Sequence, residues 1–180
     1  ALHDSPEHPA IFVAPGNPGM ESLATRVPIA VSDVPALVDW AKRERPDLVI
    51  VGPELPLALG IADELSAIAI PVLGPSRAAA RLESSKSFAK MTLESLSLPT
   101  APFRLAHSAE EARRIMAGAN FPLVLKADGL AAGKGVVIAH TESEALETVS
   151  SWMTGGTLGE AGKTLILEEW LEGEETSLLV

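Results

Sequence analysis

"VLKADGLAAGKGVVIA", residues Val124–Ala139, joins two apolar runs through a glycine-rich loop and is the most informative segment of the chain. A P-loop has the pattern G-x-x-x-x-G-K-[ST] and leads into a helix. Here only three residues separate Gly129 from Gly133, and Gly135 stands in place of the Ser or Thr. A β-branched apolar run then follows. The segment therefore predicts a β-hairpin whose small residues let backbone N–H groups approach an anion closely.

Three lysines are candidates for contact with a phosphate near this loop. Lys126 lies near the end of the strand that enters the loop, where an ammonium group can reach inward. Alternatively, it extends into water, as lysines at strand ends often do. Lys86 and Lys90 are four residues apart, so they share one face of a helix. Alternatively, Lys86 and Lys90 are an ordinary pair of basic residues on the surface of the helix.

An acidic segment, "LILEEWLEGEE", begins about forty residues after the start of the quoted stretch, a spacing that suits a neighbouring strand. Glu168 is near the end of its apolar run, and Trp170 and Leu171 come next. Backbone groups at such a strand end can bind an adenine edge, and apolar side chains can sandwich the ring. Glu175 is placed to accept hydrogen bonds from ribose hydroxyls. The alternative for this cluster is a solvated acidic turn.

The first part of the chain alternates short apolar strands with amphipathic helices. The expected strands are residues 10–14, 47–51 and 70–74, and the expected helices are residues 32–46 and 57–69. Ser32 is the expected N-cap of the first helix. Strand–loop–helix units in series imply a parallel sheet with right-handed crossovers.

Polar residues follow two of these strands. Ligands of such sheets bind beyond the carboxyl ends of the strands. Those ends carry "PGN", "GPE" and "GPS", which place Asn17 and Glu54 at equivalent positions. Each is also an ordinary turn residue when considered alone. Together they are candidates for lining one substrate cleft.

The second part of the chain predicts a small antiparallel sheet with helices on one face. Residues 75–97 are helical with a break near Ser84–Ser85, and the proline-rich connector "LPTAPF" follows. The expected elements after it are helices 108–119 and 141–153, strands 122–127 and 135–139, and a strand pair around a tight turn at Gly173. Ser108 with Glu111, and Thr141 with Glu144, form capping boxes. The expected organisation is a Rossmann-like domain at 1–81, a connector at 82–107 and a small lobe at 108–180.

Composition limits the possible partners. The net charge is -10 and the pI about 4.8, so the chain repels nucleic-acid phosphates. It has no cysteine, which permits a reducing cytoplasm, and no apolar run that would span a membrane. We therefore expect small-molecule substrates, no nucleic acid and no membrane. The chain begins without Met and stops within an apolar run, so we expect truncation at both ends.

Four motifs in this order resemble the ATP-grasp superfamily: "RLESSKSFAK", "LPTAPF", "VLKADGLAAGKGV" and "LEEWLEGEETS". Within it they resemble the glycinamide ribonucleotide synthetases (phosphoribosylamine–glycine ligases), as do "VAPGNPG", "VGPELPL" and "LGPS". The resemblance implies an α/β fold, with a Rossmann-like (pre-ATP-grasp) parallel-sheet domain that lacks its first strand. The small α+β lobe of an ATP-grasp domain follows. It also implies ATP with Mg²⁺ or Mn²⁺, whose ligands are expected beyond Val180, so no metal ligand is expected here.

The resemblance assigns roles to individual residues. Lys86 and Lys126 would contact ATP phosphates, and residues 129–135 would form a flap. Glu168 and the backbone of Trp170 and Leu171 would bind adenine, and Glu175 would bind ribose. The complete set of ATP-binding candidates is Lys86, Lys126, Gly129, Gly133, Lys134, Gly135, Glu168, Glu169, Trp170, Leu171 and Glu175, with Asn17 and Glu54 as substrate-binding candidates and no catalytic residue assigned.

The activity that the resemblance implies is ATP-dependent ligation of glycine to 5-phosphoribosylamine through a glycyl phosphate. The products would be glycinamide ribonucleotide, ADP and phosphate, in de novo purine biosynthesis. Two alternatives remain open. One is another ATP-grasp enzyme of purine metabolism, a carboxylase or a formate-dependent transformylase, and the other is a non-catalytic nucleotide-binding fragment. We expect residues 1–180 alone to bind nucleotide weakly or undetectably and to lack ligase activity.

Overall fold

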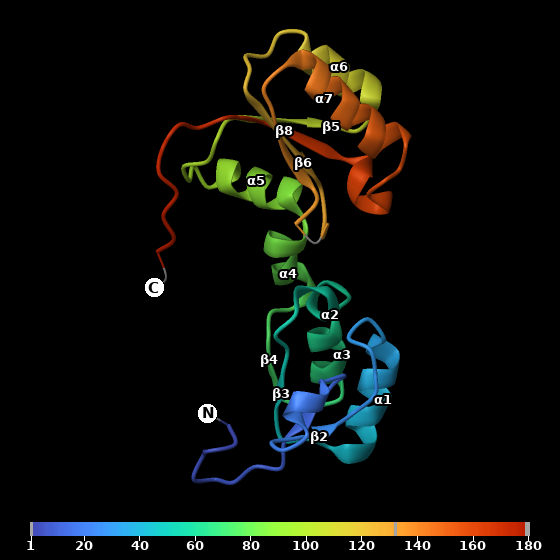
Figure 1. Cartoon of the computed structure of the whole chain (residues 1–180). Helices are drawn as coiled ribbons and strands as arrows, with labels where there is room; N and C mark the ends of the chain where they lie inside the picture. Colours follow the sequence, from blue (N-terminus) through green and yellow to red (C-terminus); the bar gives the residue numbers. More distant parts are fainter. Residues whose placement is uncertain (1, 132, 179–180) are drawn as a thin grey trace. The chain divides into compact units, whose positions relative to one another are not determined.

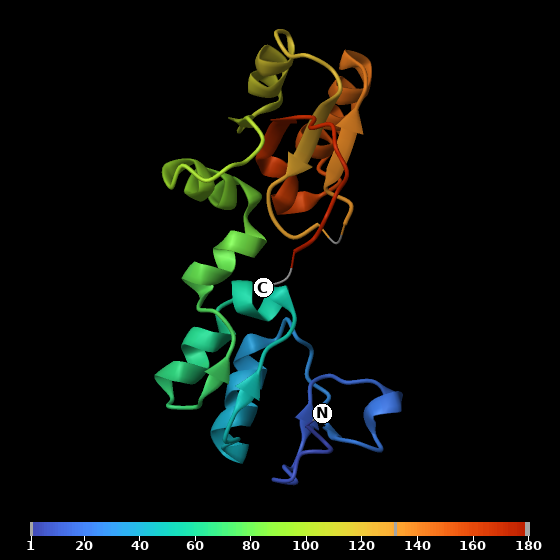
Figure 2. The ribbon, with the colours of Figure 1, turned by 90° about the vertical axis from the view of Figure 1, so that its left-hand side faces the viewer.

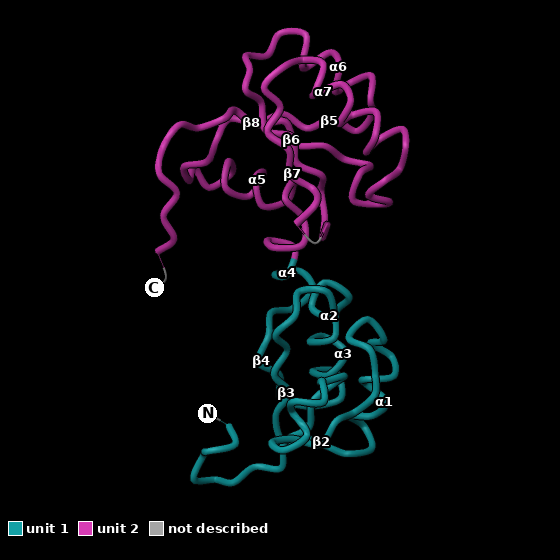
Figure 3. Tube along the Cα trace, viewed as in Figure 1, with its two compact units in different colours: residues 1–80 teal, residues 81–180 magenta. Residues whose placement is uncertain are grey.

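The computed structural model describes residues 2–131 and 133–178. It consists of two compact units, residues 1–80 and residues 81–180 (Figure 3). Within the described ranges, no helix is long and apolar enough to cross a membrane.

Unit 1, residues 1–80, contains parallel strand pairs flanked by helices (Figure 1). Strand β1 (Phe12–Val13) pairs with β2 (Thr25–Arg26), and β3 (Val49–Ile50) pairs with β4 (Val72–Leu73). Both pairs are parallel, so the predicted α/β class with parallel strands is confirmed. The helical elements of this unit are η1 (Pro18–Met20), α1 (Val34–Glu44), α2 (Glu54–Ala58) and α3 (Ile61–Ala67).

The core of unit 1 forms where α1 and α3 pack against each other. Val38 and Ala41 of α1 lie with Ile61 and Leu65 of α3 in one buried cluster. The spacing of these residues puts them on one face of each helix, which is what an amphipathic pattern requires. Burial of that apolar face, more than helix propensity, stabilises such short helices.

Strand β2 was not predicted, and two details of the helices of unit 1 also differ from the prediction. The N-cap of α1 is Asp33 rather than Ser32, because the Asp33 carboxylate accepts the Ala36 N–H at 3.1 Å. Asp and Ser are equally good caps, so the sequence alone favoured neither. The predicted single helix 57–69 is two helices. Gly60, at φ +93°, interrupts it, and left-handed backbone of this kind is most accessible to glycine.

The break predicted near Ser84–Ser85 is confirmed. Helix α4 (Arg77–Ser84) ends there and α5 (Lys86–Ser95) begins. Ser85 is extended, at φ -134° and ψ 107°, and its hydroxyl accepts the Phe88 N–H at 3.2 Å. It is therefore the N-cap of α5.

Unit 2, residues 81–180, is built on a four-stranded antiparallel sheet in the order β5-β8-β6-β7. The strands are β5 (Phe103–Ala106), β6 (Leu123–Ala127), β7 (Val136–Ala139) and β8 (Leu165–Glu169). The β6–β7 hairpin around the glycine loop is confirmed, with Lys126 opposite Val136.

Two strand predictions for unit 2 fail. Strand β5 was not predicted, because it begins at Phe103, the last residue of the proline-rich connector, and is stabilised by pairing with the distant β8. The predicted strand after Gly173 is also wrong, since residues 170–178 contain no strand. The acidic run there has few apolar side chains to bury against a neighbouring strand.

Helices α6 (Ala109–Met116) and α7 (Glu142–Val149) cover one face of this sheet (Figure 1). Met116, Leu125, Val149 and Leu165 are fully buried between them. Elements η2 (Ser150–Thr154) and η3 (Gly159–Lys163) lead from α7 to β8. Leu125 faces these helices, and side chains alternate along a strand, so Lys126 lies on the opposite face.

Both predicted N-caps in unit 2 are confirmed. Ser108 accepts the Glu111 N–H at 3.1 Å, and Thr141 accepts the Glu144 N–H at 3.3 Å. The Glu111 and Glu144 carboxylates reach back and accept backbone N–H groups of the residues before the caps, at 2.8 and 2.7 Å. These reciprocal bonds satisfy donors that the helices themselves leave unpaired.

Candidate nucleotide-binding site

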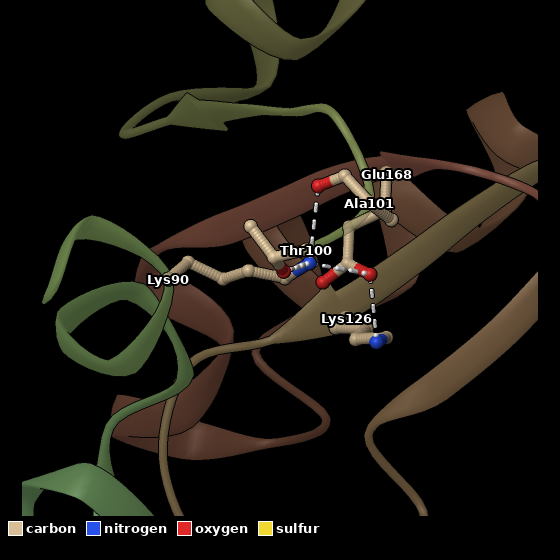
Figure 4. A network of polar contacts seen from close by, with 5 residues as sticks. All are labelled: Lys90, Thr100, Ala101, Lys126 and Glu168. Atoms are coloured by element: carbon tan, nitrogen blue, oxygen red, sulfur yellow. Dashed lines mark hydrogen bonds and ion pairs between the residues drawn. The ribbon is translucent and has the colours of Figure 1, made fainter. Parts of the chain in front are cut away.

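A buried carboxylate lies on the sheet face opposite α6 and α7. Glu168 of β8 is only 4% exposed. Lys126 of the adjacent β6 donates to its Oε2 at 2.8 Å (Figure 4). The sheet register brings the two side chains together, because Val124 pairs with Glu168 and Lys126 is two residues further along the same face. Two residues separated by 42 positions in sequence thus form one ion pair.

Lys90 of α5 approaches the same carboxylate oxygen, with its Nζ 3.2 Å from Glu168 Oε2. The same ammonium donates to Thr100 Oγ1 at 2.7 Å and to the Ala101 carbonyl at 3.2 Å (Figure 4). Two hydrogens of the ammonium are thus used in hydrogen bonds, and its contact with Glu168 is an ion pair. Lys90 is therefore held in place by three groups of the fold.

Lys126 differs from Lys90 in the number of its hydrogen bonds and in its exposure. Its hydrogen bond to Glu168 is its only polar side-chain contact with residues 2–131 and 133–178. Its side chain is 28% exposed, against 12% for Lys90. Two hydrogens of the Lys126 ammonium therefore remain for an anion.

The second oxygen of Glu168 is unsatisfied. Oε1 is buried and has no hydrogen-bond partner in the described part of the chain. A buried polar atom without a partner is unfavourable by about 1–3 kcal/mol, and more when it is charged. A donor supplied by a ligand would satisfy it. Glu168 with Lys90 and Lys126 carries a net charge of +1, which favours a ligand that also has an anionic group.

The glycine loop lies at the end of β6, beside Lys126. Gly129 and Gly133 have φ values of +111° and +79°, so both use left-handed backbone. The Ala127 N–H donates to the Gly135 carbonyl at 2.8 Å and closes the base of the loop. Gly135 is needed for a different reason, because a Cβ there would lie 2.7 Å from the Ala131 Cβ.

Lys86 contacts this loop directly. Its Nζ donates to the Gly129 carbonyl at 2.9 Å, which leaves two donor hydrogens. Helix α5 thus sends Lys86 to the loop and Lys90 to Glu168, although the sequence places both on one helix face. Figures 1 and 2 show α5 beside the sheet and near the start of the hairpin.

The remaining candidates of unit 2 are not joined to this cluster. Glu169, Trp170, Leu171 and Glu175 all lie at the end of β8 or beyond it and are exposed. Lys134 is exposed in the loop. None of these five side chains has a hydrogen bond or ion pair within the described ranges, and Ala132 of the predicted flap lies outside them. Their roles in binding stay predictions.

The two substrate candidates of unit 1 have local settings. Asn17 caps the η1 turn, where its Oδ1 accepts the Gly19 N–H at 3.0 Å. Glu54 is exposed at the first position of α2. A cavity in this unit is lined by Phe12, Arg26, Trp40 and other residues, and neither candidate contributes to it. Their role in substrate binding stays a prediction.

Two features of the site were not predicted from the sequence. Lys90 was a candidate for phosphate contact or a surface lysine, and its contacts with Thr100 and Glu168 cannot be predicted without the tertiary fold. Asp128 was not predicted to contribute, although the sequence "ADG" (residues 127–129) places a carboxylate directly before the first glycine of the loop. Its carboxylate accepts hydrogen bonds from Ser85 and Ser87.

No group of three or more His, Cys, Asp or Glu side chains in the described ranges is arranged to hold a metal ion. Glu168 is not suited to be a metal ligand by itself, because two ammonium groups already surround its Oε2. The described residues therefore do not fit the Mg²⁺ or Mn²⁺ that the sequence resemblance implies.

A glycine hairpin, a buried carboxylate on the adjoining strand and lysines from two elements form a candidate nucleotide site in unit 2, and comparison with known proteins identifies the class of this unit as ATP-grasp. Residues 84–180 match the family model described as phosphoribosylglycinamide synthetase, ATP-grasp (A) domain. Residues 1–83 match the model of the N domain of the same synthetase. The chain therefore belongs to the phosphoribosylglycinamide synthetase family.

Individual relatives agree with this assignment. The chain is 44% identical over 178 residues to a phosphoribosylamine–glycine ligase of Escherichia coli O6:H1, covering 98% of this chain and 42% of the relative. It is 43% identical over 169 residues to that of Halalkalibacterium halodurans, covering 94% and 40%. The crystal structure of the Thermotoga maritima phosphoribosylamine–glycine ligase superposes with a TM-score of 0.75 at 28% identity, covering 92% of this chain and 39% of that one. The chain thus spans about two fifths of the length of these relatives.

Proposed function

We propose that unit 2 binds ATP and that the protein carrying this chain joins glycine to 5-phosphoribosylamine. The observation that carries the ATP proposal is the Glu168 carboxylate, whose Oε2 is held by two lysines while the buried Oε1 has no partner in the described ranges. The exocyclic amine of adenine is a donor that matches Oε1. The adjoining Lys126 ammonium and the glycine loop match an anion a short distance away.

Each described group has a role in this proposal. Lys126 and Lys86 donate to phosphate oxygens with hydrogens that their present contacts leave free. The loop backbone at Gly133 has room for a phosphate, because a side-chain Cβ placed there would meet no described atom within 4 Å. Trp170 and Leu171 lie just beyond Glu168 and supply apolar surface for the base, while Glu175 binds the ribose.

The proposed chemistry has two steps. A glycine carboxylate oxygen attacks the γ-phosphorus of ATP, ADP leaves, and a glycyl phosphate forms. The amine of phosphoribosylamine then attacks the carbonyl carbon, loses a proton and expels phosphate, which yields glycinamide ribonucleotide. In this scheme Lys86 and Lys126 neutralise phosphate charge, and the loop excludes water that would hydrolyse the acyl phosphate. The metal ligands and the acceptor site are not among the described residues, so no step is assigned to them.

Phosphate release by the full-length protein tests this function. We expect release from ATP only when glycine and phosphoribosylamine are both present, with glycinamide ribonucleotide formed in equal amount. Replacing glycine with bicarbonate or formate is expected to abolish turnover. Turnover with bicarbonate or formate would favour another ATP-grasp reaction. ATP binding without any turnover would favour a nucleotide-binding role.

We also propose that the enzyme works in the cytoplasm on small molecules, with Mg²⁺ or Mn²⁺ accompanying ATP. The absence of cysteine is compatible with that compartment, and the charge of -10 disfavours nucleic acid as a partner. Substitution of Mn²⁺ for Mg²⁺ in the phosphate-release assay shows which metals support the reaction.

A further inference from the structure

The Asp128 carboxylate joins the glycine loop to the start of α5. Asp128 directly precedes Gly129, and its Oδ1 accepts the backbone N–H of Ser87 at 3.1 Å. Its Oδ2 accepts from the hydroxyls of both Ser87 and Ser85, the latter at 3.3 Å. These residues are 41 to 43 positions apart in sequence, so the contacts are tertiary.

These contacts complete the cap of α5. The first backbone N–H groups of a helix have no partner within the helix. Ser85 satisfies the Phe88 N–H, as an N-cap does, whereas the Ser87 N–H is satisfied by Asp128 from another part of the fold. The negative carboxylate also interacts favourably with the positive end of the helix. One side chain therefore fixes the first turn of α5 in space.

Lys86 lies between the two serines that Asp128 holds. Its ammonium reaches the carbonyl of Gly129, the residue after Asp128, at 2.9 Å. Asp128 is also fixed through its backbone, since its N–H donates to the Thr164 carbonyl at 3.0 Å. Asp128 thus fixes the position of the Lys86 ammonium relative to the loop, because its side chain binds the first turn of α5 and its backbone is bound to Thr164.

We infer that Asp128 is a positioning residue for Lys86 and for the base of the glycine loop. It would act by holding the first turn of α5 against the loop, so that the Lys86 ammonium is placed for a phosphate before ATP arrives. The loop would then move only beyond Gly129, since Asp128 is held by both its side chain and its backbone. This inference rests on the proposed function where it concerns ATP, but the holding contacts themselves do not require it.

Asp128→Ala removes all of the carboxylate contacts, and Asp128→Asn keeps one acceptor oxygen without the charge. In the full-length protein we expect kcat/KM for ATP to fall about 10- to 100-fold for Asp128→Ala and only a few-fold for Asp128→Asn. The matched control is Glu144→Gln, because Glu144 also supports a helix start through a backbone N–H but lies away from Lys86. It is expected to leave the kinetics within about two-fold.

A double-mutant cycle separates positioning from general stability. If Asp128 acts through Lys86, Asp128→Ala is expected to cost little further activity once Lys86→Met is present. Full additivity of the two losses would mean that Asp128 affects activity by another route, and it would overturn the inference. Asp128→Asn provides the folded comparison if Asp128→Ala proves too unstable to measure.

Amide hydrogen exchange tests the holding contacts without any nucleotide. In the full-length protein without nucleotide, Asp128→Ala is expected to speed exchange of the Ser87 and Phe88 amides about 5- to 30-fold, as loss of a helix cap does. The α6 amides are expected to stay unchanged. Unchanged exchange at Ser87 would overturn the inference whatever the enzyme does with ATP. If Asp128→Ala speeds exchange at Ser87 and Phe88 but the wild-type protein does not use ATP, the proposed function is wrong and the holding contacts of Asp128 still stand.

Discussion

The loop after β1 in unit 1 and the loop after β6 in unit 2 both place glycine and polar residues at a strand end, but they use them differently. Asn17 follows β1 and binds a backbone N–H two residues away. Lys126 and Asp128, at the end of β6 and just after it, bind groups 42 and 41 positions away. The first pattern stabilises a turn, whereas the second assembles a site from distant segments. Polar residues at strand ends thus indicate a ligand most clearly when tertiary contacts bring several together and leave one atom unsatisfied.

Lys126→Met is expected to have the largest effect on activity. It removes the partly exposed ammonium while Lys90 still pairs with Glu168, so the fold should persist. We expect kcat/KM for ATP to fall about 100-fold or more, because the lost charge neutralises phosphate as the bond breaks. Steady-state kinetics of the full-length protein measure this, with Lys42→Met as the control, since Lys42 is an exposed lysine of unit 1. An unchanged kcat/KM would return Lys126 to a purely structural role.

Lys90→Met is expected to lower the stability of the protein more, and its use of ATP less, than Lys126→Met does. The loss of Lys90 removes the donor to Thr100 Oγ1 and to the Ala101 carbonyl, and it removes one of the two ammonium groups beside the buried Glu168. We expect a loss of about 2–3 kcal/mol in the free energy of unfolding, with a smaller decrease in ATP use than for Lys126→Met. Urea denaturation and kinetics on both variants provide the comparison. If Lys90→Met impaired ATP use more than Lys126→Met, the distinction between a mainly structural Lys90 and a phosphate-binding Lys126 would be wrong.

ATP is expected to protect the glycine loop from proteolysis. Left-handed backbone at Gly129 and Gly133 and the exposed Lys134 suit a segment that opens and closes. We expect cleavage after Lys134 by trypsin to slow about 3- to 10-fold with saturating ATP in the full-length protein, through mass action on the closed form. Cleavage after Lys42 serves as the internal reference. Equal cleavage rates at Lys134 with and without ATP would contradict a mobile flap.

Asn17→Ala is expected to have the smallest effect. It removes a cap from a short exposed turn, so we expect a loss of less than about 1 kcal/mol in the free energy of unfolding. The KM for ATP is expected to stay within about two-fold of the wild-type value. A large rise in that KM would show that the loop after β1 takes part in nucleotide binding and would remove the contrast between the two loops.

The sequence predicted local features well and long-range ones unevenly. Ser85, Ser108 and Thr141 were identified as a break or caps, because each acts on residues within one helical turn. The β6–β7 hairpin was predicted for the same reason, since its partners are joined by a short loop. Strand β5 was missed and a strand after Gly173 was wrongly added, because pairing with β8 depends on tertiary contacts.

In the candidate site too, the local features could be predicted from the sequence and the long-range contacts could not. The positions of Glu168, Lys86 and Lys126 were inferred from motifs, and the structure places all three near the loop or on the sheet face beside it. The sequence could not show that Glu168 binds two lysines, nor that one of its oxygens is left without a partner in the described ranges. Those properties arise from the register of β6 and β8 and from the packing of α5.

The most direct test of the central claim compares ATP with purine riboside triphosphate, which lacks the exocyclic amine, in the full-length protein. The measured quantity is kcat/KM for each nucleotide, in the wild type and in Glu168→Gln. If Glu168 Oε1 accepts the amine, the wild type is expected to prefer ATP by about 10- to 100-fold, and Glu168→Gln to lose most of that preference. Equal use of both nucleotides by the wild type, or a preference unchanged in Glu168→Gln, would contradict the account.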